Sequence, residues 1–65
     1  MREDIRRLQK DGEYRFEGLS REESRKAAME LAEATMQEDR RNGIQSTFGI
    51  ARDGFGYYFA IQTGR

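Results

Sequence analysis

The segment that most constrains the fold is 48–61, where two apolar runs flank an Asp-Gly pair. Both runs are rich in aromatic and β-branched side chains, and five of the seven aromatic residues of the chain lie in this segment. Asp53-Gly54 is a frequent connection between antiparallel strands, because glycine tolerates the backbone angles that a tight turn requires. The segment therefore predicts a β-hairpin that contributes a large part of the core.

Alternation along the hairpin assigns its side chains to two faces, because successive residues of a strand point in opposite directions. With a two-residue turn, the apolar face is expected to hold Ile44, Ser46, Phe48, Ile50, Phe55, Tyr57, Phe59 and Ile61. We therefore expect Phe48 and Phe59 to be buried. The opposite face then carries Tyr58 as its single aromatic side chain.

A third strand is predicted at 13–17, where aromatic and charged residues alternate. Tyr14 and Phe16 would lie on one face of this strand, and Arg15 and Glu17 on the other. The two aromatic rings thus extend the apolar face of the hairpin.

A long helix is predicted from Ser20 to about Arg41. Ser20 and Glu23 have the spacing of a capping box, and Asn42-Gly43 supplies a stop signal. The buried stripe is expected to consist of Ser24, Ala28, Leu31, Ala32, Thr35 and Met36, with Met29 at its edge. Most of these side chains are small, so the helix can lie close to a sheet.

Residues 2–11 are predicted to form a short helix. Acidic residues come first and basic residues last, which suits the helix dipole, and Met1, Ile5 and Leu8 form one stripe at helical spacing. The alternative is a strand that forms a hairpin with 13–17. We favour the helix, because a strand would place Ile5 and Leu8 on opposite faces.

Together these elements predict a single α+β domain over residues 1–65, in the order α-β-α-β-β. One long helix packs on a three-stranded antiparallel or mixed sheet, with a short helix at the amino end. Since a strand-helix-strand crossover is right-handed, the first strand lies parallel to the second, and the last strand fits between them.

The residue types present restrict the chemistry of the chain. It has no Cys and no His, which excludes disulfides and removes the commonest metal ligands and general bases. The paired acids of the long helix lie opposite its apolar stripe and are expected to be solvated. We expect no metal ion and no other cofactor, and we do not expect an enzyme.

Charge and hydropathy restrict the partners. Lys and Arg together number 12, as do Asp and Glu, so the formal net charge is zero, whereas a uniformly basic nucleic-acid binder carries an excess of positive charge. The apolar runs fall far short of the roughly 20 residues that span a bilayer, and the first residues lack the apolar part of a secretory signal. These features predict a cytoplasmic protein without membrane contact.

The run Asp53-Gly-Phe-Gly-Tyr-Tyr-Phe-Ala60 resembles the aromatic octamer of the RNA-recognition motif and the similar run of cold-shock domains. The strand-helix-strand-strand order also resembles the first half of the RNA-recognition motif. The resemblance implies that Phe55 and Tyr57 stack on nucleic-acid bases. The alternation described above favours a core position for both rings instead, since turning them outward would leave the helix to pack on small residues and Tyr58.

The candidate binding surface is the sheet face that the long helix leaves open. Tyr58 is its expected anchor, flanked by Arg15 and Gln62, with Arg52 at the turn as a rim contact. A tyrosine among small and polar side chains is typical of protein contact surfaces. We interpret the sequence as a protein-interaction module, a small regulator or inhibitor of the kind that phages and mobile elements encode.

Other interpretations stay open. The edge strand 44–51 offers backbone groups to a partner's strand. Two copies that pair through their open sheet faces would form a homodimer, and the aromatic octamer offers a nucleic-acid surface. A plain solvated sheet face is also compatible with the pattern.

Overall fold

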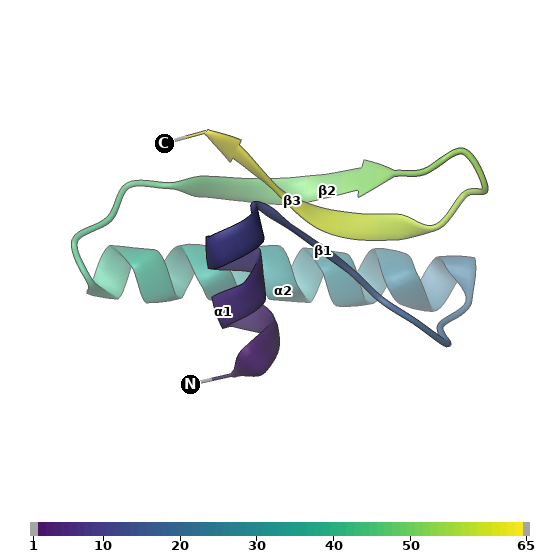
Figure 1. The fold of residues 1–65 in the computed structure, drawn as a ribbon, viewed down its shortest axis with the longest axis horizontal. Coiled ribbons are helices and arrows are strands. Elements are labelled where there is room, and N and C mark those ends of the chain that lie inside the picture. The colour runs from purple at the N-terminus through teal and green to yellow at the C-terminus, as the bar shows by residue number, and fades with distance from the viewer. Residues whose placement is uncertain (1, 65) are drawn as a thin grey trace.

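The computed structural model describes residues 2–64, which form an α+β fold of helices and strands in the predicted order (Figure 1). The elements are α1 (Glu3–Asp11), β1 (Glu13–Arg15), α2 (Arg21–Arg41), β2 (Thr47–Arg52) and β3 (Tyr58–Gly64). The predicted fold class is therefore confirmed.

The three strands form one sheet in the order β1-β3-β2. Both neighbouring pairs are antiparallel, so β1 and β2 run parallel to each other with α2 as their crossover. The predicted central position of the last strand is confirmed. α2 lies along one face of the sheet, and α1 crosses α2 at a steep angle (Figure 1). Both helices therefore cover the same side of the sheet.

Helix α1 confirms the helical interpretation of the amino-terminal segment. Ile5 and Leu8 are both buried. Gly12 ends the helix in a left-handed conformation, with φ at 80°, and its N–H donates to the Leu8 carbonyl at 2.9 Å. Glycine adopts this conformation without steric cost. Met1, which was expected in the same stripe, lies outside the described residues.

Helix α2 begins with the predicted capping box. Ser20 Oγ accepts the Glu23 N–H at 3.1 Å, and the Glu23 carboxylate accepts the Ser20 N–H at 2.8 Å. The second of these bonds lowers the pKa of Glu23. The helix buries Ser24, Ala28, Leu31, Ala32, Thr35 and Asp39, which confirms most of the predicted stripe, while Met36 is only partly buried.

The connection between β2 and β3 differs from the predicted two-residue turn. It spans residues 53–57, and the Asp53 N–H closes it by donating to the Tyr57 carbonyl at 2.9 Å. Ile50 therefore lies opposite Ala60, whereas a turn of only Asp53 and Gly54 would place Ile50 opposite Tyr57. The pairing is displaced by three residues.

This displacement turns β3 over, because an odd shift in register moves every side chain to the opposite face of the sheet. The predicted facing of the last strand is wrong. Tyr58 and Ala60 point toward α2, and Phe59 and Ile61 point away from it. The facing predicted for the aromatic residues of β1 and for Phe48 of β2 is confirmed.

Helix α1 supplies the apolar volume that β3 does not contribute. Ala60 is fully buried, and the small side chains of α2 can approach it closely. The core consists of Ile5, Leu8, Ala28, Leu31, Ala32, Phe48 and Ala60, with Tyr14, Phe16, Ala34, Met36, Ile50 and Tyr58 packed around it. Residues from both helices and all three strands thus share one core.

The facing of β3 predicts opposite responses at two alanines. Ala60→Leu should lower the free energy of unfolding by about 1–3 kcal/mol, because the added carbons have no room beneath α2. Ala51→Leu adds the same group on the open face and should change the free energy of unfolding by less than about 0.5 kcal/mol. Urea unfolding followed by circular dichroism measures both variants. Equal losses would contradict the observed facing.

Candidate interaction surface

The sheet face opposite α2 is not covered by any helix or strand within residues 2–64. We call it the outer face. The pairing and the alternation of the strands place on it Glu13, Arg15, Thr47, Gly49, Ala51, Phe59, Ile61 and Thr63. Its centre is therefore apolar.

The structure separates the residues predicted for the binding patch. Arg15 lies on the outer face, as expected. Tyr58, Gln62 and Arg52 lie on the side that faces α2, because Tyr58 is opposite Arg52 and Gln62 is opposite the core residue Phe48. The predicted outward placement of Tyr58 and Gln62 is wrong, for the register reason given above, and Arg52, predicted as a rim contact at the turn, lies at the end of β2 beside the loop. Tyr58 packs against the core instead of anchoring an open surface.

The aromatic side chain that β3 presents on the outer face is Phe59 and not Tyr58, and Arg15 lies over its ring. Its guanidinium carbon lies 3.9 Å from the ring centre of Phe59, a cation–π contact. Glu13 and Asp53 flank it, with N···O distances of 3.1 and 3.9 Å. Phe59 is only 8% exposed, although within residues 2–64 no helix or strand covers this face of the sheet. Movement of the half-exposed Arg15 would expose more of this ring to a partner.

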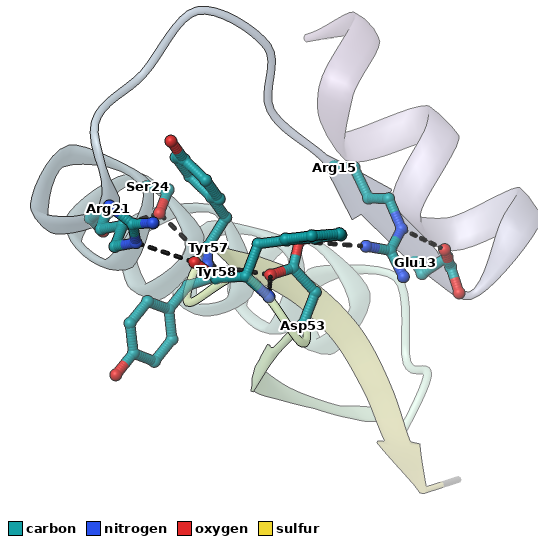
Figure 2. A network of polar contacts seen from close by, with 8 residues as sticks. Glu13, Arg15, Arg21, Ser24, Asp53, Tyr57 and Tyr58 are labelled. Atoms are coloured by element: carbon teal, nitrogen blue, oxygen red, sulfur yellow. Dashed lines mark hydrogen bonds and ion pairs between the residues drawn. The ribbon is translucent and has the colours of Figure 1, made fainter.

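The loop 53–57, which we call the aromatic loop, adjoins the outer face. Phe55 is 79% exposed and Tyr57 is 39% exposed. The Asp53 carboxylate accepts the N–H groups of Phe55 and Tyr57 at 2.8 and 3.0 Å (Figure 2). One carboxylate thus fixes the backbone on both sides of Gly56.

Arg21, at the start of α2, holds the same loop from the other side (Figure 2). Its Nε donates to the Phe55 carbonyl at 2.8 Å, and its guanidinium lies 4.9 Å from the ring centre of Tyr57. Gly56 allows this close approach: its φ is 91°, and a Cβ there would lie 2.8 Å from Arg21 Nε. A side chain at this position would be strained.

Ser24 ties the first residue of β3 to α2. Its buried hydroxyl accepts the Tyr58 N–H at 3.0 Å and donates to the Arg21 carbonyl at 2.7 Å. The last pair between β1 and β3 joins Arg15 and Phe59, so within residues 2–64 the preceding residue of β3, Tyr58, has no partner in β1. The serine hydroxyl replaces that partner, and the loop enters the sheet in a fixed position.

Sequence reasoning did not identify Arg21, Ser24 or Phe59 as parts of the surface. Ser24 gave a usable signal, because a hydroxyl on a buried stripe must find a hydrogen-bond partner. Arg21 gave no such signal, since a basic residue in the first turn of a helix is usually expected to be exposed to solvent. Phe59 was expected to be buried and it is, but under Arg15 instead of under α2.

The polar contacts of the loop lower the pKa of Asp53. The Tyr57 N–H contributes most, and the Phe55 N–H and the positive charge of Arg15 add to it. Because the folded pKa is lowered, the stabilisation is fully present above the pKa of an unfolded aspartate, about 3.9, and is lost as pH falls through the folded value.

The Asp53 titration should be visible at the amides that it holds. In NMR spectra recorded from neutral to acid pH, the amide protons of Phe55 and Tyr57 should shift together, with a midpoint below that of an unfolded aspartate. Asp53→Asn should abolish this transition, and its unfolding should depend less on pH in the acid range. A midpoint at or above the unfolded value would contradict the geometry of the loop.

Within residues 2–64, acidic side chains do not gather in groups of three or more that could hold a metal ion. Over the same residues, no helix has both the length and the apolar character needed to cross a bilayer.

Comparisons of this chain with protein-family models, curated proteins and solved structures give no match. Function therefore has to be argued from the surface itself.

Proposed function

We propose that this chain is a non-enzymatic protein-interaction module that binds a protein partner through its outer face and aromatic loop. The observation that carries the proposal is the presentation of Phe55. Phe55 is 79% exposed, while its own N–H and carbonyl are hydrogen-bonded to Asp53 and Arg21. An aromatic side chain on a backbone that is already ordered loses little entropy on binding.

The surroundings of Phe55 support a protein partner. Tyr57 lies two residues away, and Phe59 with its covering Arg15 continues the surface onto the sheet. Aromatic side chains and arginine are the residue types that dominate binding energy at protein interfaces. The module would act by occupying a site on its partner, as a regulator or inhibitor in the cytoplasm. A phage or mobile-element origin fits such a role by analogy only.

Nucleic-acid binding is the second candidate, and the exposure of the aromatic loop favours it. Phe55 and Tyr57 are the positions to which the RNA-recognition resemblance assigns base stacking, and both are exposed. Against this, Arg15 pairs with Glu13 and Asp53, and Arg21 is bound to the loop itself. Two of the cations beside the loop are thus engaged within the protein and are less available to phosphates than Arg52, which is exposed at the start of the loop.

Photo-crosslinking in a lysate of the native host tests the proposal. A photoreactive phenylalanine at position 55 should crosslink to one protein, with or without nuclease, and the crosslink should survive moderate salt. The same group at Met29, which is 51% exposed on α2, is the matched control and should not give this product. Crosslinks that disappear with nuclease, or that fall steeply with salt, would favour the nucleic-acid alternative. The same products from both positions would contradict the proposed surface.

A further inference from the structure

The two edges of the sheet differ in their protection against another strand. The β1 edge is three residues long, and two of them, Glu13 and Arg15, are charged. The β2 edge is six residues long, and only its last residue, Arg52, is charged. Natural proteins protect free edges with charges, proline or short strands, and β2 has little of this protection.

The hydrogen bonds of β3 show which backbone groups of β2 are free. Gln62 lies opposite Phe48, but its N–H donates to the Gly12 carbonyl, on the β1 side, at 2.8 Å. Tyr58 lies opposite Arg52, and its N–H likewise turns away, to Ser24. These are the non-bonded pairs of the antiparallel ladder, which alternate with bonded ones.

The corresponding residues of β2 therefore point their backbone groups out of the sheet. These residues are Phe48, Ile50 and Arg52. Their N–H and C=O groups form a row with the two-residue spacing that an added strand can satisfy.

An apolar groove runs beside this edge, between β2 and α2. It has a volume of about 490 Å³. Met29, Ala32, Met36, Phe48 and Ile50 give it a mainly apolar lining, to which Glu33, Gln37 and Arg40 of α2 add polar groups. Methionine side chains adapt their shape to a neighbour. A strand added to β2 would thus gain apolar contacts as well as backbone hydrogen bonds.

We propose that β2 pairs with β2 of a second copy of this chain, antiparallel about a two-fold axis at Ile50, to form a six-stranded sheet. This register places Phe48 opposite Arg52 of the other copy, and Thr47 opposite Asp53. No like charges meet along the seam, so the strand is complementary to itself, as a two-fold interface requires. The inference does not depend on the proposed function.

Size favours a second copy as the occupant. A chain of 65 residues buries a smaller fraction of its surface on folding than a larger protein does, about 60%, and association adds to the buried apolar area. The two-fold axis puts both copies of α2 on the same side of the sheet, where the two methionine-lined grooves join along the seam. The outer faces of both copies remain open, so the dimer would be bivalent.

Two experiments on the purified protein test the dimer. Sedimentation at rising concentration should give a dimer by hundreds of micromolar. Thr47→Glu places an acid opposite Asp53 twice and should raise the dissociation constant at least tenfold, whereas Thr47→Lys, the matched control, should not raise it. A strict monomer, or equal effects of the two substitutions, would overturn the proposal.

Disulfide trapping tests the register, because the chain has no cysteine of its own. In the Ile50→Cys variant the two cysteines lie directly opposite each other across the axis, with a Cα separation of about 5.5 Å that a disulfide can bridge, so a covalent dimer should form under mild oxidation. Thr63→Cys, exposed on the outer face, should crosslink at least tenfold more slowly. Preferential crosslinking at position 63 would indicate pairing through the outer faces and would overturn the edge-strand dimer.

Discussion

The Leu31→Ala variant should lose about 2–5 kcal/mol of unfolding free energy. Leu31 is 1% exposed and lies in the core that both helices and the sheet share. A chain of 65 residues is expected to have a free energy of unfolding of only about 3–10 kcal/mol. The variant should therefore be close to unfolding at 25 °C, which urea titrations monitored by circular dichroism will show.

Met29→Ala is the matched control for this prediction. Met29 lies on the same helix two residues earlier, but its side chain is 51% exposed, so its truncation should cost less than about 1 kcal/mol. Equal unfolding midpoints for the Leu31→Ala and Met29→Ala variants would mean that α2 presents a different face to the sheet.

The helices were predictable because their signals are local. The capping box of α2 lies within four residues, and the glycine that ends α1 follows directly after it. The burial of Ile5 and Leu8 follows from spacing on a single helix. Each of these interactions joins residues that are close in sequence, so their pattern can be read without knowledge of the tertiary structure.

The facing of β3 was not predictable in this way, because it depends on the length of the loop before it. The loop is held open by Arg21 and Ser24, each bonded to a residue 34 positions later. The Asp-Gly pair suggested a tight turn, and Asp53 uses its carboxylate to stabilise a wider one. A contact across 34 residues thus decides which face of the last strand enters the core.

The predicted binding site was partly wrong because the predicted register of β3 was wrong. The sequence indicated that one face of the sheet stays open and that Arg15 lies on it, and both hold. It placed Tyr58 there too, whereas the outer face carries Phe59 beneath Arg15. The exposure of Phe55 is also a consequence of the wider loop. Under a tight turn the same ring would have been the first core residue of β3.

Phe55→Ser should weaken partner binding about 30-fold or more, the effect of about 2 kcal/mol that defines a dominant interface side chain. The melting temperature should stay within a few degrees of the parent, since Phe55 is 79% exposed and contributes little to folding. Titration calorimetry with the crosslinked partner, once purified, measures the affinity. An unchanged affinity would remove Phe55 from the interface.

Arg21→Ala separates the contribution of the ring from that of its rigid presentation. This variant keeps Phe55 but removes the bond to its carbonyl and the contact with Tyr57. We expect a smaller loss, about 3- to 10-fold, because the loop must then be ordered on binding. Arg21→Lys retains the charge without the planar guanidinium and should behave like Arg21→Ala. If Arg21→Lys binds like the parent, the positive charge at this position contributes to binding, and the geometry of the loop does not.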